Sequence, residues 1–124
     1  MEDGLTFFFD SYALVELYEG NQNYAKFEDI KAVTSYFNIY ETYYILRKKY
    51  PERDLEEYLK QLKRISINLK FSWITKAVEF RLEHRKNEFS YADCLGYVMA
   101  KDLNIKFLTG DNQFKTMPNV EFLK

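Results

Sequence analysis

The chain has 124 residues, 47% hydrophobic and 30% charged, with a formal net charge of −1; this is typical of a soluble globular protein and predicts one domain over residues 1–124. Charged residues interrupt every apolar run well before the roughly 18 residues that would suggest a membrane span. A single cysteine excludes an internal disulfide, and one cysteine with one histidine cannot build a zinc cage of four such ligands.

Strands are predicted to alternate with helices along the chain. The predicted strands are residues 5–9, 30–34, 66–71, 105–110 and 120–123. The predicted helices are residues 11–19, 22–28, 35–49, 52–64, 72–86 and 91–103. Gly20 and Pro51 follow two of these helices and are suited to ending them. The alternation predicts an α/β fold with a mainly parallel sheet covered by helices on both faces.

Two aspartates stand where predicted strands end. Asp10 follows the apolar run 5–9, and Asp111 follows the strand 105–110. Open parallel sheets bind ligands outside the carboxyl ends of their strands, so we expect both carboxylates at a ligand site.

Two further acidic residues lie on predicted helices. Glu41 is one helical turn from Phe37 on one side and from Tyr44 on the other, and a carboxylate among apolar neighbours is costly to bury unless it is paired or binds a metal. Asp93 is followed along its helix by the small residue Gly96, which would allow close backbone approach. Four acidic residues at strand ends and on helix faces together predict a divalent-metal cluster.

Each aspartate also has a purely structural alternative. Asp10 could cap the helix that starts at Ser11, and Asp93 could form a capping box with Ser90. Asp111 lies in a sequence with the composition of a turn. Capping and metal binding are compatible, so these alternatives do not exclude the cluster.

Four motifs, in order, resemble those of PIN-domain nucleases, particularly the small VapC-type toxins of toxin–antitoxin pairs. The motifs are Phe9-Asp10-Ser11, Asn38-Ile39-Tyr40-Glu41, Tyr91-Ala92-Asp93-Cys94 and Phe107-Leu108-Thr109-Gly110-Asp111-Asn112-Gln113-Phe114. The resemblance implies a three-layer α/β/α sandwich with a central, mostly parallel five-stranded sheet. It also implies a ribonuclease that depends on Mg²⁺ or Mn²⁺, a homodimer, and a cognate antitoxin that blocks the acidic pocket.

The corresponding hypothesis for catalysis uses metal ions and no protein nucleophile. Asp10, Asp93 and Asp111 would ligate one or two ions, and Glu41 would ligate an ion or orient a bound water. A second group of polar side chains would hold the metal ligands or the scissile phosphate. Their alternative role is to form hydrogen bonds in turns and helix caps. The members of this group are Ser11, Thr109 and Asn112.

Basic residues are concentrated in the middle of the chain. Residues 41–90 contain twelve basic and eight acidic side chains, whereas residues 1–40 contain two and seven. The candidates for contacts with RNA phosphates are Arg47, Lys48, Lys49, Lys60, Lys63 and Arg64. The amino terminus, with Glu2 and Asp3, lacks the basic start of a secretory signal, so a cytoplasmic location is expected.

Other functional classes fit the residues less well. A nucleophilic pair of Cys94 and His84 is formally available, but His84 lies in a charged stretch typical of a solvated helix end. A receiver-type signalling domain would need an acid ending the strand predicted at 66–71, and a phosphatase with an aspartate nucleophile would need a second aspartate where Tyr12 stands. A non-catalytic RNA-binding or scaffolding module with a PIN-like fold is the remaining alternative.

Overall fold

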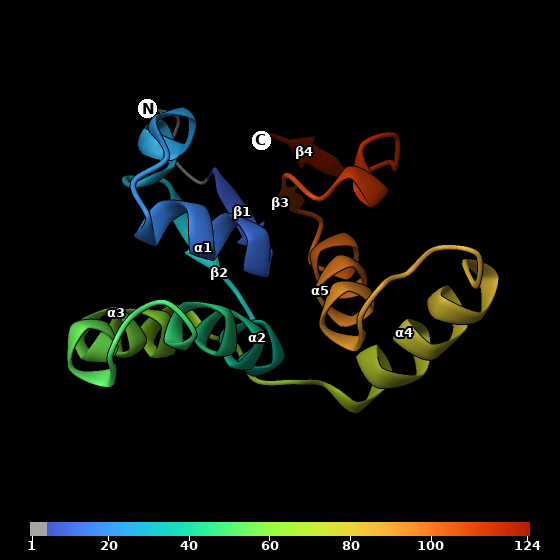
Figure 1. Cartoon of the computed structure of the whole chain (residues 1–124). Helices are drawn as coiled ribbons and strands as arrows, with labels where there is room; N and C mark the ends of the chain where they lie inside the picture. The colour runs from blue at the N-terminus through green and yellow to red at the C-terminus, as the bar shows by residue number, and fades with distance from the viewer. Residues whose placement is uncertain (1–4) are drawn as a thin grey trace.

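The computed structural model describes residues 5–124 (Figure 1), so residues 1–4 of the predicted domain lie outside the described part. Its strands are β1 (Thr6–Phe9), β2 (Lys31–Val33), β3 (Lys106–Thr109) and β4 (Val120–Phe122). Its α-helices are α1 (Ser11–Tyr18), α2 (Tyr36–Arg47), α3 (Glu52–Ile65), α4 (Phe71–Glu83) and α5 (Tyr91–Asp102), with two 3-10 helices, η1 (Gln22–Phe27) and η2 (Asn112–Phe114). Over residues 5–124, no helix is both long enough and apolar enough to cross a membrane.

The four strands form one parallel sheet in the order β2-β1-β3-β4. The register places Phe8 of β1 beside Val33 of β2 and Phe107 of β3. The chain leaves β1 toward β2 on one side and returns to β3 on the other, which opens a crevice at the carboxyl ends of β1 and β3. The prediction of an α/β fold with a parallel sheet is confirmed.

The prediction of a fifth strand over residues 66–71, all of which the structure describes, is wrong. Ser66 forms a single parallel bridge with Thr34, and the Ile67 N–H donates to the Thr34 carbonyl oxygen at 3.0 Å. The chain then leaves the sheet, and Phe71 begins α4. Ile67 still packs against the core, but Leu69 and Phe71 are 40% and 77% exposed, so no buried apolar face after Ile67 holds the chain in the sheet.

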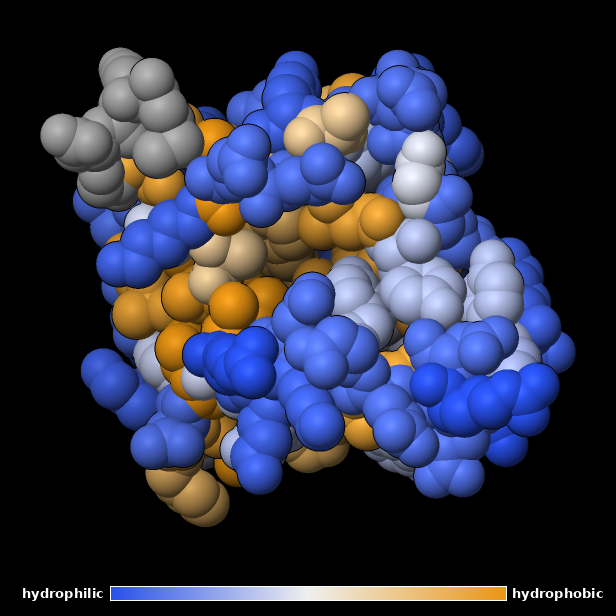
Figure 2. All heavy atoms as spheres, turned by 90° about the vertical axis from the view of Figure 1, so that its left-hand side faces the viewer, coloured by the Kyte–Doolittle hydropathy of each residue, from blue (hydrophilic) through white to orange (hydrophobic). Residues whose placement is uncertain are grey.

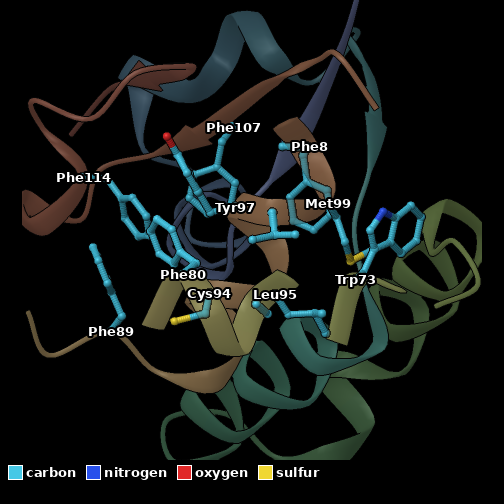
Figure 3. Packing of buried hydrophobic residues seen from close by; sticks show 13 residues of the cluster. Phe8, Trp73, Phe80, Phe89, Cys94, Leu95, Tyr97, Met99, Phe107 and Phe114 are labelled. Atoms are coloured by element: carbon cyan, nitrogen blue, oxygen red, sulfur yellow. The ribbon is translucent and has the colours of Figure 1, made fainter. Parts of the chain in front are cut away.

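Alternating side chains of the central strands bind helices to both faces of the sheet. Phe7 and Phe9 of β1 pack with Leu108 against α1, η1 and α3. Phe8 and Phe107 point to the opposite face, where they pack against α4 and α5 (Figure 3). This period of two produces the expected three-layer α/β/α sandwich.

A group of aromatic rings fixes α5 against the sheet. Tyr97 of α5 packs between Phe80 of α4 and Phe107 of β3, with ring centroids 4.9 and 5.7 Å away, and Phe114 adjoins it (Figure 3). The Tyr97 hydroxyl donates to the Pro118 carbonyl oxygen at 2.6 Å. A Cβ at Gly96 would lie 2.8 Å from the Phe8 ring, so the missing side chain lets α5 approach β1. This packing determines where the amino-terminal end of α5 lies.

Gly110, which follows β3, has no room for a side chain. A Cβ there would lie 2.3 Å from the Tyr12 ring and 2.4 Å from the Leu123 carbonyl oxygen. Because a backbone oxygen cannot rotate away, we expect Gly110→Ala to lower the free energy of unfolding by about 1–3 kcal/mol, measured by urea denaturation. The control is Asn112→Ala at an exposed neighbouring position, which should change it by less than about 0.5 kcal/mol. Equal effects of the two variants would contradict this reading of the turn.

Candidate metal centre

Three of the four predicted acidic residues converge. Asp10, Glu41 and Asp93 each offer a carboxylate oxygen, and these oxygens all lie within 4.8 Å of one another. Asp10 directly follows β1 at the centre of the sheet, Glu41 is in α2, and Asp93 is in the first turn of α5. Residues 83 positions apart are therefore brought together at the carboxyl end of the central strands.

The Asp10 carboxylate is held from two sides and is almost completely buried. The Thr109 hydroxyl donates to its Oδ2 at 2.7 Å, and the Asn38 amide donates to its Oδ1 at 3.4 Å. Asp10 occupies the N-cap position of α1, but its side chain makes no capping hydrogen bond. The capping alternative therefore does not explain its placement.

Asn38 is a residue of the site that the sequence analysis missed as a candidate. It is fully buried, and its amide also donates to the Ser11 hydroxyl at 3.1 Å. Ser35 caps α2 and holds Asn38 in turn, with its hydroxyl donating to Asn38 Oδ1 at 2.6 Å. The available signal was its spacing: Asn38 lies three residues after a capping serine and three before Glu41, in the motif Asn38-Ile39-Tyr40-Glu41.

Asp93 combines the predicted capping box with a place in the acidic cluster. Its Oδ2 accepts from the Ser90 N–H at 2.8 Å, and its own N–H donates to the Ser90 hydroxyl at 3.0 Å. These bonds fix the carboxylate at the start of α5 while leaving it within reach of Asp10 and Glu41. The structural role and the site role coexist.

Glu41 reaches the cluster for a different reason from the one expected. Phe37 and Tyr44 are 47% and 61% exposed, so the apolar surroundings of Glu41 are a surface and not a buried face. The buried side of α2 carries Asn38, Thr42 and Leu46, and Glu41 is half-buried at its edge. Glu41 therefore reaches the cluster from the edge of the buried side of α2, and the expectation that its apolar neighbours are buried is wrong.

Asp111 lies beside this group but outside it. Its Oδ1 accepts from the Gln113 N–H at 3.0 Å, as expected for the turn alternative, and its N–H donates to the Thr109 hydroxyl at 3.1 Å. Its negative charge nevertheless contributes to raising the pKa of Asp93. Asn112 is exposed at the start of η2.

The three carboxylates oppose one another electrostatically. Burial raises the pKa of Asp10 well above its ordinary value, and the charges of Asp93 and Glu41 raise it further. Burial also raises the pKa of Asp93 to about 6, with Glu41 and Asp111 adding to the shift. Within residues 5–124, no lysine, arginine or histidine forms a salt bridge with any of the three. Buried, uncompensated oxygen ligands fit a hard divalent cation such as Mg²⁺ or Mn²⁺.

The candidate RNA-binding residues are spread over two helices. Arg47, Lys48 and Lys49 are at the end of α2, where Lys49 is paired with Glu19 at 3.1 Å. Lys60 and Lys63 line a surface groove beside Tyr36, whereas Arg64 lines a different groove. The structure does not bring these six residues together at one surface.

The cysteine and histidine do not have the environment of a nucleophilic pair. Cys94 is buried, and burial raises the pKa of its thiol to about 11. His84 packs on the Phe80 ring, and its Nδ1 lies 2.9 Å from the Phe80 carbonyl oxygen. The thiol is therefore kept protonated at neutral pH.

The raised pKa of Asp93 predicts a pH dependence of stability. The folded chain binds this proton more tightly than the unfolded chain, in which an aspartate titrates near about 3.9. The resulting stabilisation is present below that value and is lost as the pH rises through about 6. In EDTA, we expect a higher melting temperature at pH 5 than at pH 7.5, and a smaller difference for Asp93→Asn. An identical difference in the two proteins would contradict the assignment.

Comparison with known proteins identifies the family and similar folds. The family model described as PIN domain matches residues 7–120. Among solved structures, VapC20 of Mycobacterium tuberculosis, described as a sarcin-ricin loop cleaving toxin, is similar with a TM-score of 0.76 and 16% identity, over 95% of this chain and 99% of that one. No curated protein matches the sequence significantly.

Two solved toxin–antitoxin structures share the fold as well. One is a complex from Klebsiella pneumoniae, with a TM-score of 0.72, 18% identity, and 92% of this chain and 94% of that chain covered. The other is VapBC2 of Rickettsia felis bound to a DNA fragment from their promoter, with a TM-score of 0.70, 16% identity, and coverages of 96% and 98%. At such identities the structures establish the common fold. Because the PIN-domain model matches residues 7–120, the chain belongs to the PIN-domain family.

Proposed function

We propose that this chain is a metal-dependent endoribonuclease and the toxin of a type II toxin–antitoxin pair. The observation that carries the proposal is the convergence of Asp10, Glu41 and Asp93 without a balancing cation among the described residues. Membership of the PIN-domain family and the fold shared with VapC toxins support the nuclease and toxin assignments.

In this proposal three acidic residues bind the cation and a fourth lies beside them. Asp10, Glu41 and Asp93 hold Mg²⁺ or Mn²⁺, and Asp111 borders the site from the end of β3. A divalent cation held there supplies Lewis-acid chemistry: it favours deprotonation of the attacking water and stabilises charge on the phosphate. Because the three carboxylates already lie within 4.8 Å of one another, none has to move far for binding.

The neighbouring polar residues position Asp10. Thr109 and Asn38 donate to its two oxygens, which fixes the plane of the carboxylate. Ser11 supports Asn38, accepting from its amide and donating to its carbonyl oxygen at 3.3 Å. Such partners of metal ligands typically affect metal affinity or activity by about 10- to 100-fold. Asn112 stays a candidate for phosphate contact because it is exposed beside Asp111.

Protein partners belong to the proposal too. Two of the similar structures are toxin–antitoxin complexes, which supports a cognate antitoxin for this chain. The face that carries α1 and α3 shows apolar side chains gathered in a hollow (Figure 2), a groove of about 830 Å³ whose lining includes Leu17, Ile30 and Leu62. We propose that an antitoxin that blocks the acidic pocket also contacts this groove, and that the toxin is a homodimer.

The nuclease proposal predicts that single carboxylate-to-amide changes abolish cleavage. Asp10→Asn and Asp93→Asn keep the shape of the side chain but remove the negative charge that holds the cation. We expect each to lower the rate of RNA cleavage by about 100-fold or more, with EDTA abolishing cleavage by the wild type. The measurement is cleavage of a labelled RNA with Mn²⁺ or Mg²⁺, resolved on a gel.

The matched control is Glu121→Gln, which removes an exposed acidic charge on β4. It should cleave at the wild-type rate. Cleavage by Asp93→Asn at the wild-type rate, or cleavage by the wild type that persists in EDTA, would remove the basis for the proposal. Melting temperatures of all variants show whether a loss of cleavage is a loss of folding.

A further inference from the structure

An exposed aromatic surface surrounds Glu41 on α2. Phe37, Tyr40 and Tyr44 are 47%, 75% and 61% exposed, and their spacing of three and four residues places them on one side of the helix. Glu41 lies on the same side, between them in the sequence. Rings this exposed contribute little to the core, so their clustering around a candidate metal ligand calls for a binding role.

This surface continues onto α5. Phe37 and Tyr91 line one groove of about 740 Å³, which runs between α4 and the beginnings of α2 and α5. Tyr91 is the first residue of α5, is 74% exposed, and precedes Asp93 by two positions. We call Phe37, Tyr40, Tyr44 and Tyr91 the aromatic strip. It passes two of the three converging carboxylates.

A cation lies at each end of the aromatic strip. Lys48 Nζ is 4.8 Å from the centroid of the Tyr44 ring, and the Arg81 guanidinium is 4.6 Å from that of Tyr91. Arg81 Nε also donates to the Phe89 carbonyl oxygen at 3.3 Å, which holds the guanidinium in place. Neither cation forms a salt bridge within residues 5–124. Both are therefore available to an anionic ligand.

The chemistry of these residues fits an unpaired nucleic-acid strand. Flat exposed rings bind bases by stacking, and this requires bases that are not paired in a duplex. Lysine and arginine bind phosphates, and arginine does so with two parallel hydrogen bonds. We propose that the aromatic strip stacks on unpaired bases of the substrate while Lys48 and Arg81 bind flanking phosphates. The inference rests on the proposed RNA cleavage and assigns the residues that position the RNA.

A second copy of the chain is the competing occupant. Ile74, Val78 and Leu82 of α4 border the same groove and are 39–52% exposed, an aliphatic edge that suits a protein partner. Lys48 and Arg81 favour RNA, because phosphates supply the negative charges with which neither side chain forms a salt bridge within residues 5–124. The following experiment distinguishes the two occupants.

Fluorescence anisotropy measures binding of a labelled 12-nucleotide RNA, single-stranded or annealed to its complement, in EDTA so that cleavage does not interfere. Removing one stacking ring should weaken single-strand binding by about 5- to 100-fold in Kd, so we expect this loss for Phe37→Ala and Tyr91→Leu. Tyr91→Phe, which keeps the ring, should bind like the wild type. The duplex should bind more weakly and respond to none of these changes.

The control is Tyr36→Ala, which removes an exposed ring of the same helix that faces Lys60 and Lys63 instead. It should change Kd less than twofold. Equal losses for Tyr36→Ala, no loss for Tyr91→Leu, or no single-strand binding by the wild type would overturn the inference. A lower molecular mass of Phe37→Ala by light scattering, accompanying its loss of binding, would assign the groove to a second copy.

The two proposals fail separately. If the wild type binds single strands through the aromatic strip but does not cleave them with Mn²⁺, the nuclease proposal is refuted and the proposal for the aromatic strip stands. If cleavage depends on metal but Phe37→Ala and Tyr91→Leu bind RNA as the wild type does, the proposal for the aromatic strip is refuted and the nuclease proposal stands.

Discussion

The repulsion between three buried or half-buried carboxylates is the constraint on which the rest of the structure depends. Asp10, Glu41 and Asp93 lie within 4.8 Å of one another, and none is neutralised by a basic side chain of the described chain. A fold can hold such a group only if packing elsewhere offsets the cost. Here the aromatic packing of α5 on the sheet and the close approach allowed at Gly96 fix Asp93, while β1, at the centre of the sheet, fixes Asp10.

Hydrogen bonds and burial have opposite effects on whether the carboxylates of the cluster are charged or protonated. Donors from Thr109, Asn38 and the backbone of Ser90 support the charged carboxylates, whereas burial opposes them and raises the pKa of Asp10 and Asp93. In the proposed function, a proton and a divalent cation therefore compete for the same carboxylates. Binding of a divalent cation to the folded chain alone would stabilise it by mass action, which links folding to the proposed activity.

The sequence predicted most of the fold because most of its periodic apolar residues are buried in the core. Phe7, Phe8 and Phe9 alternate between two buried faces, and the residue after them lies at the central crevice, so Asp10 could be placed from the sequence. The segment 66–71 has a similar apolar pattern, but only Ile67 packs against the core while Leu69 and Phe71 are exposed, and exposure cannot be read from hydrophobicity alone. Glu41 converges with Asp10 and Asp93 although its apolar neighbours are exposed, and Asn38 was missed because a buried amide gives no hydrophobic periodicity.

Anomalous X-ray diffraction from crystals grown with Mn²⁺ tests the central claim most directly, since it locates the ion without any assay of activity. The proposed site requires an anomalous peak at roughly 2.0–2.3 Å from carboxylate oxygens of Asp10 and Asp93, with Glu41 bound directly or through a water. No peak at saturating Mn²⁺, or a peak only at other acidic residues, would show that the three carboxylates converge for a reason other than metal binding.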